Sequence, residues 1–312
     1  MKGRIIPSSF VISMFFAGGA LLYAGSIDVS LSSLLLGMLL SALILSASVP
    51  AAVEVFSSAS VSSTSGKGRR FLLVILAPMT ALAALWAALS VSREFSDFAS
   101  DVMLLRLPSV LISLLFLLFC SFFASKGIEV MRKLAFYGLP LLIFGALLLL
   151  IYSIPSFRAE VFTIDLGTPD VNDLLWVSAR LFLPLALPSV LLCTGRRVRA
   201  TPLGVILGLL IGVILLLICQ LNVTLLFGDT LSESLERPYP EAVRTITAGK
   251  LFLRLEGVFY AMYFAAASFR CALCIALTVS MTGKLFPRLS KMFLSFFFGG
   301  AVYLLLIFSA LG

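Results

Sequence analysis

Long apolar segments recur along the whole sequence and restrict its possible folds more than any other feature. Each is about 20 residues long, the length that an α-helix needs to cross roughly 30 Å of hydrocarbon at about 1.5 Å per residue. Inside lipid the backbone must satisfy its own hydrogen bonds, so these segments are expected to be helices rather than strands of a barrel. The predicted spans are residues 9–25, 31–55, 71–92, 107–125, 134–153, 174–194, 203–227, 251–281 and 292–311. The sequence therefore predicts an all-α, polytopic transmembrane helical bundle with about nine spans.

The composition argues against a water-soluble enzyme. Hydrophobic residues make up 61% of the 312 residues and charged residues 12%, whereas soluble domains are about 45–50% apolar and about 25% charged. The chain has no histidine, which removes His-based metal sites, proton relays and Ser-His or Cys-His catalysis. Cys271 and Cys274 have CxxC spacing, but within a span this pair is interpreted as packing rather than redox chemistry. We expect no catalysis, no cofactor and no metal site.

The distribution of charge indicates the orientation of the spans. The net charge is +8, and most of the 23 Lys and Arg residues fall on one side of the membrane when the predicted spans are threaded through it. Because cytoplasmic loops carry the excess of Lys and Arg, we expect a cytoplasmic N-terminus, an outer C-terminus and no nucleic-acid partner. Most acidic residues, including Glu94, Asp97 and Asp101, fall in outer segments. They form either a solvated face or a vestibule that attracts cations.

Helix-breaking residues interrupt the first and sixth predicted spans. The first contains Gly18 and Gly19, followed by Ala20, and the sixth contains Pro184 and Pro188. Glycine permits unusual dihedral angles and close approach, and each proline removes a helical hydrogen bond. If five spans form one repeat, these helices occupy matching positions in inverted halves, which is the pattern of a midplane binding site in secondary transporters. Freed N–H groups there would suit a carboxylate. A packing notch and a simple kink are the alternatives.

Charged and aromatic residues within the spans are further candidates for a functional site. Arg254 and Glu256 lie near the start of the eighth span, and Arg270 lies much deeper. Because a charge at the bilayer centre costs about 2.5–3.5 kcal/mol on insertion scales, Arg270 is expected to face protein, a partner or an aqueous cavity. Trp86 and Tyr260 are candidates to line the interior, with aromatic filling as the alternative.

Three stretches of sequence resemble one family. They are "SREFSDFASDVMLLRLP", "SKGIEVMRKLAFYGLPLLI" and "RPYPEAVRTITAGKLFLRLEGVFYAMYFAAASFR". In this order and spacing, over about residues 90–290, they resemble the B-subunits of bacterial spore germination receptors. That family is itself similar to amino-acid permeases of the amino acid–polyamine–organocation superfamily.

The resemblance implies a LeuT-like fold in a single transmembrane domain, 1–312. Two inverted repeats, 1–153 and 154–312, would place a ligand between spans one, three, six and eight. The family usually has ten spans, so the second repeat is expected to lack its tenth. The implied role is recognition of a germinant, commonly an amino acid, beside A and C subunits. The implied location is the cell membrane, and the inner spore membrane in a spore former.

The resemblance also implies roles for individual residues. Gly18, Gly19, Pro184 and Pro188 would mark the unwound, ligand-facing segments, with Ala20, Trp86 and Tyr260 completing the predicted ligand-binding set. A second set would hold structural or gating charges. Its members are Arg93, Glu94, Glu129, Arg132, Arg254, Glu256 and Arg270.

Two other functions compete with germinant recognition. A secondary amino-acid or cation transporter of the same fold would move substrate when reconstituted alone. A degenerate membrane scaffold subunit would neither bind nor transport. A receptor subunit would bind its ligand with little or no flux and would depend on partner subunits.

Overall fold

The computed structural model describes residues 67–100, 107–154, 202–227, 255–286 and 288–311, with a few single positions elsewhere (36–37, 40, 44, 171–172, 175 and 241). The first predicted span and nearly all of the second and sixth lie outside these residues. In the described part of the chain every regular element is helical and no strand occurs. The all-α prediction is confirmed for these residues.

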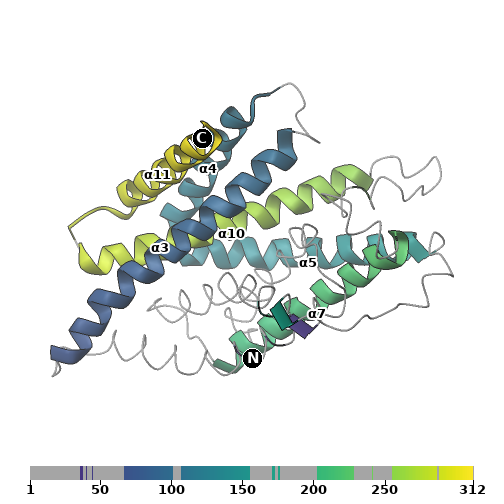
Figure 1. Ribbon diagram of the computed structural model, residues 1–312, viewed down its shortest axis with the longest axis horizontal. Helices are drawn as coiled ribbons and strands as arrows, with labels where there is room; N and C mark the ends of the chain where they lie inside the picture. The colour runs from purple at the N-terminus through teal and green to yellow at the C-terminus, as the bar shows by residue number, and fades with distance from the viewer. Residues whose placement is uncertain are drawn as a thin grey trace, which may run out of the picture.

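The described helices follow the apolar segments of the sequence closely. Their bounds are α3 Lys67–Phe98, α4 Ser109–Lys126, α5 Ile128–Ser153, α7 Pro202–Phe227, α10 Leu255–Leu285 and α11 Lys291–Leu311 (Figure 1). The described residues contain four helical stretches that are long and apolar enough to cross a membrane. These stretches are Ser109–Lys126, Ile128–Leu148, Gly257–Gly283 and Lys291–Phe308. A shorter apolar stretch, Leu203–Leu215, belongs to α7.

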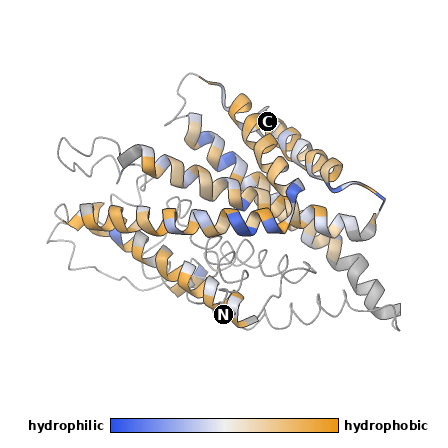
Figure 2. Cartoon of the chain, turned by 180° about the vertical axis from the view of Figure 1, so that it is seen from behind, coloured by the Kyte–Doolittle hydropathy of each residue, from blue (hydrophilic) through white to orange (hydrophobic). Residues whose placement is uncertain are grey.

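Many large hydrophobic side chains lie on the outer faces of the helices, which fits a lipid environment. Large hydrophobic side chains such as Leu115, Phe136, Leu147 and Phe308 are more than half exposed, and orange predominates on several of the coloured helices in Figure 2. A helix that is apolar on every side belongs in a large core or in a membrane. These findings indicate a membrane protein.

A glycine separates α4 from α5. Gly127 has a φ of 83°, a conformation that costs about 1–2 kcal/mol for residues with a Cβ. Its backbone N–H donates to the Ala124 carbonyl at 3.2 Å, which closes the last turn of α4. Lys126 lies in that last turn and Glu129 in the first turn of α5, so both complement the helix dipoles.

Helix α10 is the centre of the described bundle. It packs against α3, α4, α5 and α11 and crosses the middle of the molecule (Figure 1). Within an 18-residue window of its apolar stretch Gly257–Gly283, 83% of the residues are buried, compared with 39%, 22% and 28% in the corresponding windows of α4, α5 and α11. The central helix is therefore α10, and the others shield it.

Small residues let α3 and α10 approach closely. On α3 they recur at spacings of three and four residues, at Ala77, Ala81, Ala84, Ala88 and Ser92. On α10 the matching series is Ala267, Cys271, Cys274 and Thr278. Small residues at this spacing are typical of helix–helix contacts in membranes, where packing rather than the hydrophobic effect drives association.

A glycine also sets the contact between α11 and α4. A Cβ placed on Gly299 would overlap the Ser121 hydroxyl and lie 3.7 Å from the Leu117 carbonyl oxygen. The neighbouring Gly300 has nothing within 4 Å of the same position. Gly299 therefore permits the close approach of α11 to α4, and Gly300 does not contribute to it.

Candidate functional site between α3 and α10

A row of buried polar groups crosses the interface between α3 and α10. Ser92 Oγ on α3 donates to the Ala88 carbonyl at 2.7 Å and lies 3.5 Å from Cys271 Sγ on α10. Further along α10, Thr278 Oγ1 lies 3.0 Å from the Cys274 carbonyl oxygen and 3.4 Å from the Ala81 carbonyl oxygen of α3. A hydroxyl bonded to a carbonyl of its own helix is tolerated in an apolar environment because its proton is satisfied locally.

The row continues toward α4. Ser96 Oγ lies 2.7 Å from the Ser92 carbonyl oxygen and 2.6 Å from Ser113 Oγ on α4. Cys120 of α4 lies against α10, with its Sγ 3.7 Å from the Ser268 carbonyl oxygen. We call this set the polar seam, and its members are Ser92, Ser96, Ser113, Cys120, Ser268, Cys271 and Thr278.

The polar seam extends over much of the thickness of a membrane. From Ala81 to Ser96, α3 rises about 22 Å at about 1.5 Å per residue, which is most of the roughly 30 Å hydrocarbon core. Every member of the seam is buried. The Ser268 hydroxyl has no hydrogen-bond partner among the described residues. Since a buried polar group is normally hydrogen-bonded, this position is one where a ligand or water would be favourable.

Arg270 is a buried charge on α10, one residue before Cys271 of the polar seam. Its side chain is only 6% exposed, although it lies inside the apolar stretch Gly257–Gly283. Its sequence neighbours Phe269 and Cys271 are also buried, and Arg270 interacts with groups around it. Burying a charge within a membrane span costs free energy, so ionisable residues are rare there. Where one occurs, the default hypothesis is a functional site such as a substrate or ion path. Guanidinium groups bind carboxylates through two parallel hydrogen bonds.

Aromatic rings pack together near one end of the polar seam. Phe95 of α3 stacks on Phe116 of α4 with ring centroids 4.2 Å apart, and Phe98 lies 4.2 Å from Tyr263 of α10. Tyr260 packs edge-on against Phe98 at 5.7 Å. This cluster flanks Ser96 in sequence and lies where α3 finishes and α10 begins.

The sequence-predicted residues fall into several places. Gly18, Gly19, Ala20, Pro184, Pro188 and Arg254 lie outside the described residues. Glu256 belongs to the first turn of α10, and its side chain is not described. Glu129 and Arg132 are exposed on the first turns of α5. Of the described ones, the exposed Glu129 and Arg132 do not belong to the buried polar seam.

Of the remaining predicted residues, only Arg270 is buried. Tyr260 is half-buried in the aromatic cluster, whereas Trp86 is 59% exposed. Trp86 is about 18 Å along α3 from Phe98, the ring that Tyr260 touches, so the structure does not bring the two predicted aromatic residues together. Arg93 is exposed and Glu94 half-buried at the last turns of α3.

The sequence interpretation missed the polar seam. A single serine or cysteine in a helix gives no signal of a site, because its side chain can hydrogen-bond to a carbonyl of its own helix. The signal that could have found it is the repeat of small residues at spacings of three and four on both α3 and α10, which predicts that these helices pack together.

No protein-family model matches the chain, and no curated protein matches it. The resemblance to germination receptor B-subunits therefore depends on the three stretches of sequence alone.

Proposed function

We propose that the chain is a membrane-embedded subunit that recognises a small polar ligand, an amino acid, in the manner of a spore germinant receptor B-subunit. The observation that carries this proposal is Arg270, a charged side chain buried in an apolar helix at the centre of the bundle. A guanidinium in this position offers a ligand carboxylate a charge-assisted, bidentate contact that water does not compete for.

The arrangement of α3 and α10 supports the same reading. They are the third and eighth predicted spans, which in a LeuT-like fold both border the ligand. They pack together along the polar seam, as the contacts of Ser92 with Cys271 and of Thr278 with Ala81 demonstrate. We propose that the nine-span inverted repeat and its ligand site, completed by spans one and six, are built around this pair.

The proposed setting follows from the resemblance. The chain would be a multi-pass subunit of the cell membrane, or of the inner spore membrane, with its N-terminus cytoplasmic and its C-terminus outside. It would act with A and C subunits by binding its ligand and not by catalysing a reaction.

A secondary transporter of amino acids or cations is the second candidate. The observation that favours it is the length of the polar seam, because hydroxyl and thiol groups follow α3 across about 22 Å of the bundle. A ligand-sensing subunit needs polar groups only around its ligand, whereas a carrier needs them along a path.

Reconstitution in liposomes distinguishes these functions. Equilibrium binding and uptake of labelled amino acids are measured on the full chain, with and without co-purified partner subunits. Saturable binding without flux is the result expected of a receptor subunit. Flux by the chain alone would instead establish a transporter. A folded chain that neither binds nor transports any amino acid, with its partners present, would contradict both and favour a scaffold.

A further inference from the structure

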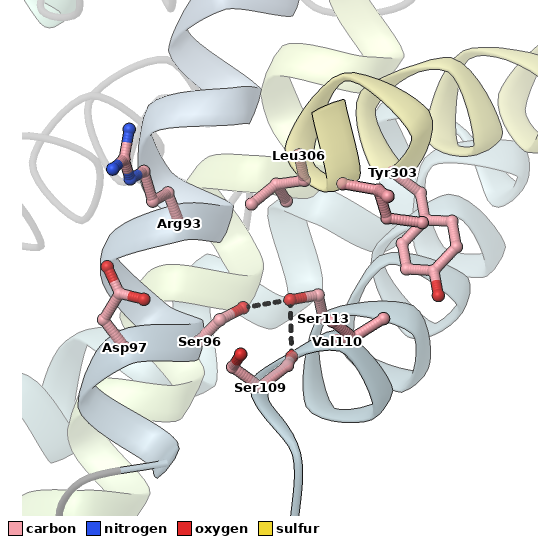
Figure 3. Close-up of a pocket in the computed structure, with 9 residues that line it drawn as sticks. Arg93, Ser96, Asp97, Ser109, Val110, Ser113, Tyr303 and Leu306 are labelled. Atoms are coloured by element: carbon pink, nitrogen blue, oxygen red, sulfur yellow. Dashed lines mark hydrogen bonds between the residues drawn. The ribbon is translucent and has the colours of Figure 1, made fainter. Parts of the chain in front are cut away.

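A cavity opens between α3, α4 and α11, where Ser96 and Ser113 form one end of the polar seam. Its volume is about 100 Å³, small beside the roughly 300–1,000 Å³ of pockets for drug-sized molecules. It lies at the end of α3, on the side of that helix that faces α4 and α11 (Figure 3). The predicted ligand site between spans one, three, six and eight does not include α4 or α11.

One wall of the cavity carries both signs of charge. Arg93 and Asp97 are one turn apart on α3, and both line the cavity and are exposed. Figure 3 shows them along the same side of the helix. A site with one fixed cation and one fixed anion discriminates against simple anions and simple cations, because either would meet a like charge.

Two nearly buried serines form the floor. Ser96 and Ser113 are 1% and 3% exposed, and their hydroxyls lie 2.6 Å apart (Figure 3). Each also lies 2.7 Å from a carbonyl of its own helix, at Ser92 and Ser109 respectively. These three contacts need three protons, but two hydroxyls supply only two. Both hydroxyl protons are therefore used within this set, and the remaining hydroxyl lone pairs can accept from an ammonium group, which has three N–H donors.

The opposite wall is apolar. Val110 of α4 and Leu306 and Ile307 of α11 line it, and Tyr303 adds a ring with a polar tip. An aliphatic group would be placed there without leaving a polar atom unpaired. In a cavity of about 100 Å³ that group is a short one.

We propose that this cavity binds a small zwitterion with a short aliphatic side chain, its carboxylate at Arg93 and its ammonium at Asp97 and the Ser96–Ser113 hydroxyls. This site is distinct from the ligand site proposed beside Arg270. The two can be tested apart, because they share no charged residue.

Site-directed labelling reports on this cavity alone. Val110 lines the cavity and is 43% exposed, whereas Leu115, further along α4, is 57% exposed and is not part of the lining. The full chain carrying Val110→Cys or Leu115→Cys is placed in nanodiscs and labelled with a water-soluble thiosulfonate reagent. The unsubstituted chain gives the background, since its described cysteines are buried.

The probes are glycine and L-alanine, compared with propionate, which lacks the ammonium, and L-alaninamide, which lacks the carboxylate. We expect glycine or L-alanine to slow the labelling of Val110→Cys and to leave Leu115→Cys unaffected. We then add Arg93→Gln or Asp97→Asn to Val110→Cys. Each should raise by about tenfold the concentration of L-alanine that halves the labelling rate, since each removes a charge-assisted contact. Arg288→Gln, an exposed arginine away from the cavity, should not change it.

Two results would overturn the proposal. One is labelling of Val110→Cys that neither glycine nor L-alanine slows in the folded chain. The other is protection by propionate or L-alaninamide equal to that by L-alanine, because a single charge would then suffice. Amino-acid binding that survives Arg93→Gln but is lost in Arg270→Gln would support the central site independently of this outcome.

Discussion

Replacing Gly299 by alanine tests the contact that holds α11 against α4. A helical Gly→Ala change gains about 1 kcal/mol from backbone propensity. At Gly299 the new methyl meets the Ser121 hydroxyl, and overpacking of this kind costs about 1–3 kcal/mol. At Gly300 the methyl meets nothing within 4 Å, so only the gain remains. Gly299→Ala should therefore be about 1–3 kcal/mol less stable than Gly300→Ala.

The assay is thermal unfolding of both variants, in the same detergent, followed by size-exclusion or intrinsic fluorescence. At about 2–4 °C per kcal/mol the expected difference in Tm is about 2–12 °C, with Gly299→Ala the lower. Adding Ser121→Ala to Gly299→Ala removes the overlapping hydroxyl and should recover most of the loss, which a double-mutant cycle measures. Equal Tm values for Gly299→Ala and Gly300→Ala would refute the close approach of α11 to α4. That outcome would also remove one wall of the cavity, since Tyr303 is one turn beyond Gly299.

Three further changes probe other contacts. Asn222→Ala should lower stability by about 1 kcal/mol, measured as a fall in Tm, because it removes the buried hydrogen bond that Ser153 of α5 makes to α7. Gly127→Ala should cost about 1–2 kcal/mol in the same assay, because a Cβ is strained at a φ of 83°; an unchanged Tm would argue against this junction. Ala88→Leu should cost about 1–3 kcal/mol and weaken ligand binding, because Ala88 is fully buried where α3 meets α10; full binding by a folded Ala88→Leu protein would contradict that packing.

The positions of the described helices were largely predictable from the sequence. Predicted spans 107–125 and 292–311 correspond to α4, Ser109–Lys126, and α11, Lys291–Leu311. The thickness of the bilayer fixes the length of an apolar segment, so hydropathy alone finds such helices. Helix α10 is described from Leu255, and residues 251–254, where the predicted eighth span starts, lie outside the described residues.

The partners of each helix were not predictable in the same way. Ser92 and Cys271 are 179 residues apart in sequence, and apolar side chains suit lipid and protein neighbours equally. Hydropathy therefore did not identify α10 as the central helix. Its buried Arg270 was the one clear sign, because a charge in a span must face away from lipid.

The cavity was only partly visible in the sequence. The resemblance implies a role for Arg93, and the charge pattern puts Asp97 among the acids of an outer face. Ser96 and Ser113 were not singled out, since serines in helices commonly bond to their own backbone. Their hydroxyls lie 2.6 Å apart because α3 packs against α4, and no local sequence pattern predicts that contact.

Amino-acid binding by the full chain with Arg270 replaced is the most direct test of the proposed function. Labelled amino acids are titrated onto wild-type protein, Arg270→Gln, Arg270→Lys and the exposed control Arg288→Gln in nanodiscs with any co-purified partners, after each Tm confirms folding. We predict that Arg270→Gln weakens binding by about tenfold or more, that Arg270→Lys retains part of it, and that Arg288→Gln matches wild type. Wild-type affinity in a folded Arg270→Gln protein would contradict a ligand site built around this buried charge.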